Sequence, residues 1–483
     1  MKHIIIIIII AAGMAACQPA TNDIRLKYRD DGTFKVAQFT DLHFVDGSPN
    51  STRTEATIKY VLETERPDVA ILTGDQVIDR PSANVWPAIA RLFEEARTPF
   101  AVVFGNHDAE TITRDSVFDI LLRSPCFIGQ RGPEDIHGVG NYILEVRSPT
   151  SGNVAALLYC FDSNDYTRND RLGYYDWIHY DQIAWYRQQS ARYTHANGNR
   201  PLPALAFFHI PLQEYANVAG KEATVGTVGE GVFPGEINSG MFASFVDMQD
   251  VKGVFVGHDH DNDYIGITFG IALAFGRVTG TDAYGKLERG ARIIELYEDM
   301  PDSFTTWIRT PSGVEHKYYY PSGITDDQEK NSAYLPAQPV NPAANGVTYT
   351  YCEGNFQSTD EITAAPALKT GTLPNFSIAE TNAEDSFAYA FRTWIKIPER
   401  GIYRFYTYSD DGSRLLIDGQ PVVNNDGSHS KQYAYGTVAL DAGFHDLHLL
   451  YFEDYMEHTL EAGFLSKSIP ETPIPDSLLY LPE

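Results

Sequence analysis

Side chains that bind metals or transfer protons recur just after short hydrophobic runs between residues 39 and 260. Five segments carry them: FTDLH (Asp41, His43), LTGDQ (Asp75), VFGNHD (Asn106, His107, Asp108), FFHIP (His209) and VGHDH (His258, His260). In an open α/β sheet, ligands bind beyond the carboxyl ends of the strands, so the five loops are expected to converge. Imidazole, carboxylate and amide groups suit manganese, iron or zinc. Because the set contains no cysteine, a thiolate zinc site is not expected.

Each segment also has an ordinary structural interpretation. A single histidine at a strand end, such as His209, is more often a hydrogen-bonded core residue, and a lone GNHD or GHDH is usually a polar turn. All five segments, in this order and each at a strand end, indicate a functional site.

The elements that must position these residues alternate between strand and helix. Short β-branched and aromatic runs predict strands near 35–40, 68–74, 100–105, 141–146, 154–161, 204–209 and 251–257. Amphipathic stretches predict helices near 52–65, 84–96, 179–191 and 241–248. Further strands are expected near 269–276, 291–297 and 304–309, with almost no helix between them, so this end should be antiparallel. Residues 18–312 are therefore interpreted as one α/β domain.

The sequence pattern changes after residue 312. Residues 313–345 are rich in proline, glycine and asparagine and lack periodicity, which indicates a linker. Residues 346–466 contain only strand patterns with Asp-Gly turns, which predicts an all-β sandwich, and 467–483 are expected to form a C-terminal tail. A chain of 483 residues also exceeds the size at which a single hydrophobic core keeps growing, so two domains are expected.

The charge of the chain restricts its partners. A formal charge of -27 argues against binding nucleic acid, because phosphate backbones are met by lysine and arginine. A phosphorylated substrate would therefore need local positive charge, which bound metal ions would supply.

The first 17 residues, MKHIIIIIIIAAGMAAC, have the features of a secretory signal peptide. They resemble the signal of a bacterial lipoprotein, which implies lipid modification of Cys17 and an exported, membrane-anchored protein in the periplasm or on the cell surface. A conventional cleaved signal or an uncleaved anchor is the alternative. Three cysteines remain, Cys126, Cys160 and Cys352, so at most one internal disulfide is expected.

The five segments, together with GYYDWIHYDQIAWY, HIPLQEY and GHDHDNDY, make residues 34–310 resemble the calcineurin-like metallophosphoesterase superfamily. Within it they resemble the branch related to small purple acid phosphatases. The resemblance implies an α/β fold of two sheets flanked by helices, with two metal ions between the sheet ends. One metal would be held by Asp41, His43, Asp75 and His260, and the other by Asp75, Asn106, His209 and His258. His107 would face the substrate, with Asp108 orienting it and Asn262 and Tyr264 lining the substrate side.

The same resemblance implies hydrolysis of a phosphate ester. Two neighbouring cations repel unless a carboxylate and a hydroxide lie between them, and Asp75 would be that carboxylate. Metal-held water would attack phosphorus, and His107 would protonate the leaving alkoxide. Purple acid phosphatases carry a tyrosine three residues after the GD aspartate, where this chain has Ile78, and they lack a histidine at the position of His43. We therefore expect a colourless enzyme with a histidine ligand in place of the tyrosinate, and the choice among manganese, iron and zinc stays open.

Residues 346–466 resemble the protective-antigen-like β-sandwich of bacterial glycosidases, toxins and yeast adhesins, through GIYRFYTYSDDGSRLLIDGQPVVNNDGSH and GTVALDAGFHDLHLLYFE. In adhesins the paired aspartates, here Asp410 and Asp411, help to hold a calcium ion that ligates a sugar. Hard oxygen ligands suit calcium. The alternative is that SDDGS is a turn and the sandwich only packs against its neighbour.

The preferred hypothesis is a phosphomonoesterase outside the cytoplasm that acts on a phosphorylated small molecule or glycan and carries a glycan-binding domain. A phosphodiesterase would use the same metal ligands. A hypothesis from another class is a glycan-binding or adhesion lipoprotein whose phosphoesterase domain is an inactive scaffold.

Overall fold

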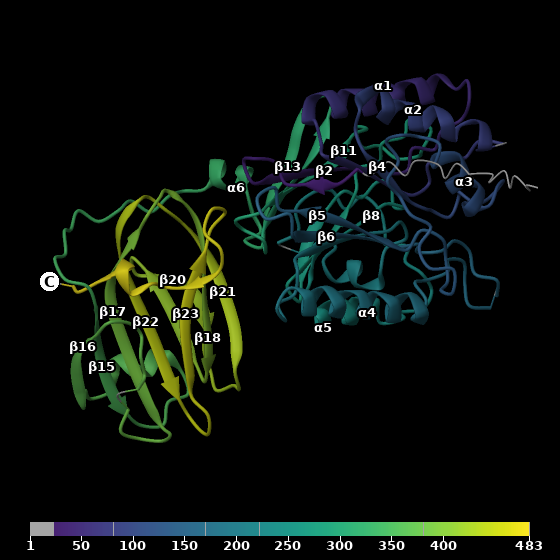
Figure 1. Ribbon diagram of the computed structural model, residues 1–483. Helices are drawn as coiled ribbons and strands as arrows, with labels where there is room; N and C mark the ends of the chain where they lie inside the picture. The colour runs from purple at the N-terminus through teal and green to yellow at the C-terminus, as the bar shows by residue number, and fades with distance from the viewer. Residues whose placement is uncertain (1–23, 81, 170, 222, 380, 483) are drawn as a thin grey trace, which may run out of the picture.

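The computed structural model describes residues 24–482 except residues 81, 170, 222 and 380. The expected signal peptide, residues 1–17, and the lipidated Cys17 lie outside this range. The chain forms two lobes, an α/β lobe followed by an all-β lobe (Figure 1). Within the described range, no helix is long and apolar enough to cross a membrane.

Two seven-stranded sheets pack face to face in the first lobe (Figure 1). One has the order β1 (Leu26–Lys27), β5 (Tyr142–Arg147), β6 (Val154–Cys160), β7 (Ala204–Phe207), β8 (Val251–Val256), β10 (Ile271–Phe275), β9 (Ile265–Thr268). The other has the order β14 (Ile324–Thr325), β13 (Gly313–Tyr320), β12 (Phe304–Thr310), β11 (Ala291–Tyr297), β2 (Thr33–Phe39), β3 (Val69–Thr73), β4 (Phe100–Val103).

Helices cover the outer faces of both sheets. Helices α1 (Pro49–Glu65), α2 (Trp86–Ala96) and α3 (Arg114–Leu121) lie outside the sheet that contains β2, and α4 (Tyr180–Ala196) and α5 (Met241–Met248) lie outside the other (Figure 1). Apolar residues of both sheets fill the space between them, including Phe207, Phe255 and Phe304. The predicted two-sheet sandwich flanked by helices is confirmed.

Parallel pairing brings the functional loops to one end of each sheet. Strands β2, β3 and β4 are parallel neighbours in one sheet, and β6, β7 and β8 are parallel neighbours in the other. Strands β3 and β4 are completely buried, which fixes the start of the loop that follows each of them. All five predicted segments leave the carboxyl ends of strands from these two groups.

The predicted linker begins too early. Residues 313–325 continue the second sheet, because β13 pairs with β12 and β14 pairs with β13. Tyr318 and Tyr320 are buried in this strand, and the flanking proline and glycine residues, which suggested a linker, form its turns. A short helix, α6 (Asp326–Asn331), follows behind a capping box made by Thr325 and Gln328. The chain then runs along the second lobe, with isolated bridges from Leu335 to Leu440 and from Gln338 to Phe444.

The second lobe is an antiparallel β-sandwich, as predicted. Its larger sheet has the order β16 (Lys369–Leu373), β15 (Val347–Glu353), β17 (Phe387–Ile397), β22 (Gly443–Glu453), β19 (Ser413–Ile417), β20 (Gln420–Asn425). The smaller sheet has the order β21 (Gln432–Leu440), β18 (Gly401–Asp410), β23 (Thr459–Leu465), β24 (Thr472–Pro473). The expected tail belongs to the sandwich, because β24 pairs with β23 and β25 (Leu479–Tyr480) pairs with β17.

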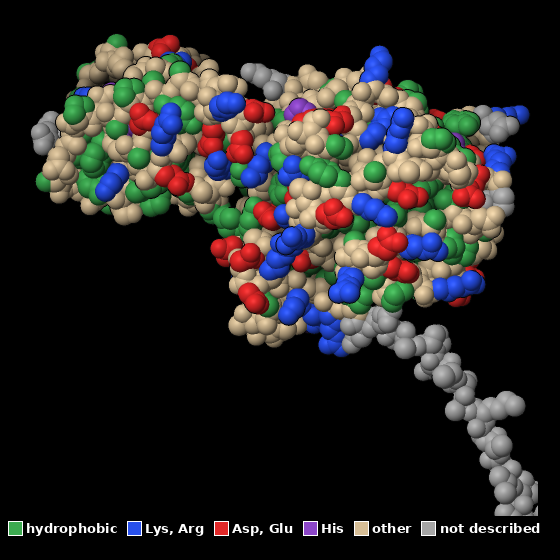
Figure 2. All heavy atoms as spheres, turned by 90° about the horizontal axis from the view of Figure 1, so that it is seen from above, with side chains coloured by type: hydrophobic (Ala, Val, Ile, Leu, Met, Phe, Trp, Pro, Cys, Tyr) green, Lys and Arg blue, Asp and Glu red, His purple; other side chains and the backbone are tan. Residues whose placement is uncertain are grey.

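A small junction joins the lobes. Ile324 packs with Ile402 and Ala439 of the sandwich, and the Lys467 ammonium forms an ion pair with Glu329 of α6. Seen from above, the lobes meet at a narrow waist, and acidic and basic side chains are interspersed over this face (Figure 2). On this face the acidic excess does not gather into one patch.

Candidate metal centre

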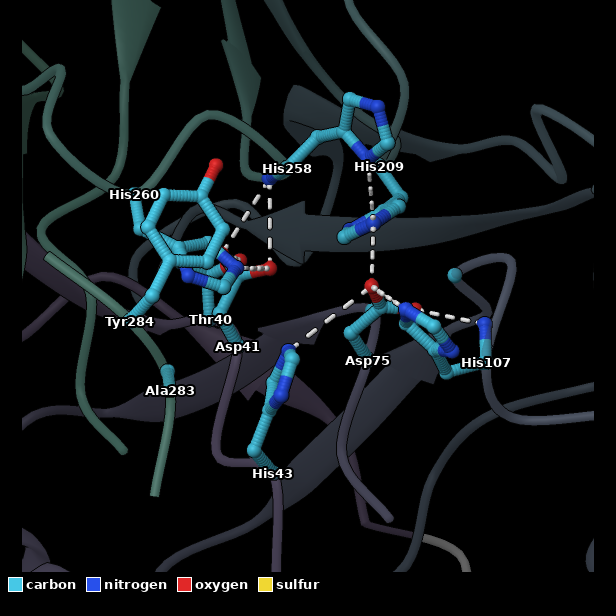
Figure 3. A network of polar contacts seen from close by, with 12 residues as sticks. Thr40, Asp41, His43, Asp75, His107, His209, His258, His260, Ala283 and Tyr284 are labelled. Carbon is cyan, nitrogen blue, oxygen red and sulfur yellow. Dashed lines mark hydrogen bonds and ion pairs between the residues drawn. The ribbon is translucent and has the colours of Figure 1, made fainter. Parts of the chain in front are cut away.

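The five loops meet at one buried cluster between the ends of the two sheets (Figure 3). Two groups of donors lie there: Asp41, His43 and His260 in one, and Asp75, His209 and His258 in the other. Within each group, one donor atom per residue lies within 4.8 Å of the others. All six residues are buried. The structure therefore brings together six of the seven residues that the sequence placed around two metal ions.

Asp75 lies between the two groups. Its Oδ2 atom is 3.1 Å from His209 Nε2 and 3.9 Å from His43 Nε2. In the first group, His260 Nε2 is 3.2 Å from Asp41 Oδ1. One carboxylate is thus placed to serve both groups, which is the position that a bridging ligand of a two-metal centre needs.

The backbone of the donor loops is held in an uncommon conformation. Four donors have positive φ angles: Asp41 (53°), His43 (46°), Asp75 (52°) and His258 (82°). Non-glycine residues rarely adopt this region, and such positions cluster at functional sites. The loops also interlock, because Asp41 N–H donates to the carbonyl of Gly74 and His43 N–H donates to the carbonyl of Asp75. No local sequence pattern predicts these positive φ angles.

Two glycines allow the loops to approach closely. A Cβ atom on Gly257 would lie 1.9 Å from Thr40 Oγ1, and one on Gly105 would lie 2.1 Å from Asp75 Oδ1. Any side chain at either position would displace a donor loop.

The orientation of the donors suits metal ligation. His209 Nδ1 donates to the carbonyl of Thr73 at 2.8 Å, which leaves Nε2 as the free ligand atom. Asn106 Nδ2 donates to Tyr166 Oη at 3.0 Å, which leaves the amide oxygen free. Asn106 Oδ1 and His43 Nε2 are buried and have no hydrogen-bond partner among the described residues. A bound cation would satisfy both, since a buried polar atom without a partner is costly.

The charges of the cluster also favour a cation. Burial opposes charge on His209, yet the carboxylates of Asp75 and Asp41 raise its pKa to about 10. Burial, together with His209, lowers the pKa of His258 to about 3. Burial would raise the pKa of Asp75, but His209 and the other imidazoles beside it lower this pKa overall. Two buried carboxylates thus require positive charge nearby, which divalent metals would provide.

Asp108 does not orient His107, contrary to the sequence prediction. Its carboxylate accepts backbone N–H groups instead, from Asp75 (3.0 Å), Gln76 (2.8 Å), Val77 (3.3 Å) and Gly105 (2.9 Å). It therefore ties the loop after β3 to the loop after β4. Because these bonds use both carboxylate oxygens deep in the protein, Asp108 is a structural anchor of the donor loops.

Glu110 takes the role that the sequence assigned to Asp108. Its Oε1 atom lies 2.7 Å from His107 Nδ1, and its Oε2 atom is 3.1 Å from the guanidinium of Arg80. The Tyr166 hydroxyl also donates a hydrogen bond to Glu110 Oε1, at 3.4 Å. The contact fixes the ring so that His107 Nε2 faces the cluster, 4.0 Å from Asp75 Oδ2. A carboxylate three residues after a histidine in a turn is the signal that could have identified it.

Asn262 and Tyr264 do not line the substrate side. Asn262 is completely buried and its Oδ1 accepts the backbone N–H groups of Gly229 and Glu230. Tyr264 is buried against Phe275, and its hydroxyl donates to the carbonyl of Tyr215. Both residues follow the last donor loop in sequence but point into the fold, so they support that loop and do not contact a ligand.

The sandwich has a separate cluster of carboxylates at one end. Asp410, Asp411 and Glu453 bring their oxygens within 4.8 Å of one another, and the Asp410–Asp411 peptide bond is cis. Asp411 also accepts the backbone N–H groups of His429 and Asp454, which holds the surrounding loops. Burial and the charges of Asp411 and Asp410 raise the pKa of Glu453 to about 8. Sequence reasoning found the two aspartates but missed Glu453, which is distant in the chain.

Comparisons with known proteins agree with this geometry. The family model of calcineurin-like phosphoesterases matches residues 34–262, and the model of the PA14 domain matches residues 343–469. The probable inactive purple acid phosphatase 29 of Arabidopsis thaliana is 33% identical over 57% of this chain and 80% of its own length. Probable inactive purple acid phosphatase 14 of the same plant is 29% identical over 59% of this chain and 82% of its length. Phosphatase DCR2 of Saccharomyces cerevisiae is 33% identical over 50% of this chain and 46% of its length.

Proposed function

Since the chain belongs to the calcineurin-like phosphoesterase family and carries a PA14 domain, we propose that it hydrolyses phosphate monoesters with two bound metal ions. The observation that carries this proposal is the complete donor set, with Asp75 reaching both groups. The names of the plant relatives call them inactive, whereas the yeast relative is named a phosphatase. The donors present in this chain favour activity.

The residues of the site have two roles: seven would bind the metal ions, and one would donate a proton. Asp41, His43, Asp75, Asn106, His209, His258 and His260 would hold the metals. Manganese, zinc or iron bound there would supply an activated water and stabilise charge on the phosphate. His107 would protonate the leaving oxygen through Nε2, because Nδ1 is engaged by Glu110 and the side chain is 34% exposed on the open side.

A comparison of two ester classes tests the proposal. Purified protein loaded with manganese, zinc or iron is expected to hydrolyse 4-nitrophenyl phosphate faster than bis(4-nitrophenyl) phosphate. The opposite preference would make the protein a phosphodiesterase that uses the same donors. Hydrolysis of neither ester by metal-loaded protein would favour the third hypothesis, a glycan-binding lipoprotein with an inactive phosphoesterase scaffold.

Changing Glu110 to glutamine is expected to lower kcat about 10- to 100-fold, because partners that orient reactive histidines typically contribute this much. The loss should be larger for esters with an alkyl leaving group than for 4-nitrophenyl phosphate, since a good leaving group needs little protonation. Steady-state kinetics with both esters measures the difference. Equal losses for the two esters would mean that Glu110 only supports the loop. Glu95→Gln, an exposed carboxylate on α2 that is paired with Lys59, is the matched control.

The proposed location is outside the cytoplasm, with a lipid anchor on Cys17. The support for this is the sequence of residues 1–17 alone. Metabolic labelling with a radioactive fatty acid, compared between the natural chain and Cys17→Ala, tests the anchor. Labelling that persists in the variant would contradict it.

A second candidate function is calcium-dependent glycan binding by the sandwich. A specific observation favours it: Glu453 is completely buried beside Asp410 and Asp411, and its Oε1 atom has no hydrogen-bond partner among the residues described. Three carboxylates in one buried cluster suit a hard cation such as calcium.

Retention of the full chain on a glycan array is expected to require calcium and to disappear in Glu453→Gln and in Asp411→Ala. The first change is isosteric, so it removes a ligand charge with little effect on packing, whereas Asp411 also holds two loops. Calorimetric titration with calcium checks the cation site directly. Normal calcium affinity in Glu453→Gln would contradict the assignment. Glu461→Gln, on the neighbouring strand β23, is the control.

A further inference from the structure

Three tyrosines from three parts of the chain pack against imidazoles of the metal-centre cluster. The Tyr284 ring stacks on His260, with 4.0 Å between ring centroids and 27° between ring planes (Figure 3). Tyr175 meets His258 edge-on at 4.5 Å, and Tyr166 approaches His107 at 6.5 Å. Aromatic rings therefore contact one imidazole of each donor group, and a third ring lies beside His107.

The same loops present large rings to solvent. Tyr174 is 62% exposed, Tyr284 56% and Phe233 52%. Tyr174 packs edge-on against Tyr166 and Tyr175, with centroid distances of 5.0 Å and 4.9 Å. The Phe233 N–H donates to Asp259, which lies between the donors His258 and His260. Large exposed apolar side chains beside a functional site usually mark a surface that a ligand covers.

Polar contacts hold these rings in place before any ligand arrives. Glu230 accepts the Tyr284 hydroxyl at 3.0 Å, and the Arg289 guanidinium donates to the carbonyls of Ala283 (2.7 Å) and Tyr284 (3.2 Å). Glu236 accepts the Tyr174 N–H at 2.7 Å. A surface fixed in this way loses little conformational freedom when it binds, which favours recognition of a rigid group.

The charges beside the rings are of both signs. Arg80 is paired with Glu110 at 3.1 Å, and Arg114 is paired with Asp162 at 2.9 Å and Asp165 at 3.5 Å. Arg168 and Arg171 are exposed on the loop that carries Tyr174, whereas Glu230 and Glu236 place carboxylates on neighbouring loops. Because these charges favour neither sign, the exposed rings are the feature that distinguishes one leaving group from another.

We propose that the site selects monoesters in which the alcohol carries a flat ring. The ring would pack on Tyr174, Phe233 and Tyr284 while the phosphate reaches the donors. This specificity rests on the proposed phosphomonoesterase function. It assigns the three exposed rings to binding of the leaving group.

Three esters with alkoxide leaving groups test this preference. Benzyl phosphate has a flat aromatic ring, whereas glycerol 2-phosphate and fructose 1,6-bisphosphate have none. The metal-loaded full chain is expected to show the highest kcat/KM with benzyl phosphate, by about 3- to 10-fold, which is the range of one aromatic contact. Equal or higher kcat/KM with either of the other esters would overturn the proposal.

Binding of non-hydrolysable phosphonates gives a readout that does not need turnover. Benzylphosphonate should bind more tightly than methylphosphonate in calorimetric titrations. Tyr174→Ala and Phe233→Ala should each weaken benzylphosphonate about 3- to 10-fold and leave methylphosphonate unchanged. Tyr180→Ala, which removes an 80% exposed ring at the start of α4, is the control.

The outcomes distinguish the two proposals. Equal affinity for both phosphonates, or equal losses for both in the two variants, would overturn the ring-binding role. If no ester is hydrolysed but Tyr174→Ala still weakens benzylphosphonate selectively, the proposed enzymatic function is wrong and the ring-binding surface stands.

Discussion

Replacing Asp75 by asparagine is expected to abolish hydrolysis and to remove metal from the centre. Asp75 is the single carboxylate that reaches both donor groups, at 3.1 Å from His209 and 3.9 Å from His43. Without its charge, two cations held side by side would repel with no anion between them. Loss of several kcal/mol of charge stabilisation corresponds to a rate decrease on the order of 10³-fold or more.

Elemental analysis of the purified variant, together with kcat for 4-nitrophenyl phosphate, measures this effect. Asp79→Asn is the matched control, because it makes the same change four residues later, on a loop position outside the donor groups. The control should keep both metal and turnover. An Asp75→Asn protein that retained two metal ions and near-normal kcat would contradict the bridging role.

Replacing His107 by alanine is expected to lower kcat about 10²- to 10⁴-fold while the metal content stays unchanged. His107 is not part of either donor group, and its side chain is 34% exposed beside the cluster. Its Nε2 atom faces the donors because Nδ1 is bound to Glu110. Removal of the ring therefore takes away a proton donor but no metal ligand.

A comparison of esters with different leaving groups gives a second test of the same variant. An ester with a basic alkoxide leaving group should suffer most, and 4-nitrophenyl phosphate should suffer least, since its leaving group departs without protonation. His137→Ala, which changes a histidine exposed elsewhere on the surface, should have no effect on either ester. Loss of metal from His107→Ala would show that the imidazole is a ligand.

The sequence was sufficient for the elements that present the donors. Hydrophobic runs such as DVAILTG and VKGVFVG became the buried strands β3 and β8, because such runs cannot remain in solvent. Helix α3 and strand β13 were not predicted. Helix α3 is only eight residues long, which is too short for a clear helical period, and β13 lies between turn residues that suggested a linker.

The donors were also predictable, since each lies shortly after the end of its strand. Contacts between side chains of different loops were not predictable from the sequence. Glu110 was missed because its contact depends on the direction of the His107 ring. Tyr284 was missed because it lies more than 20 residues after His260 in the chain. Glu453 joins Asp410 and Asp411 only after β22 folds beside β19. Such partners are set by tertiary packing, which periodicity does not encode.

One carboxylate that touches neither ligand nor substrate sets the spacing of the whole donor array. Asp108 receives four backbone N–H groups from the loops that carry Asp75 and Asn106. In a relative that kept all the donors but lost this aspartate, no carboxylate would hydrogen-bond the loop of Asp75 to the loop of Asn106. The presence of all the metal donors therefore does not by itself predict that such a relative is active. The residue at the position of Asp108 must be compared as well.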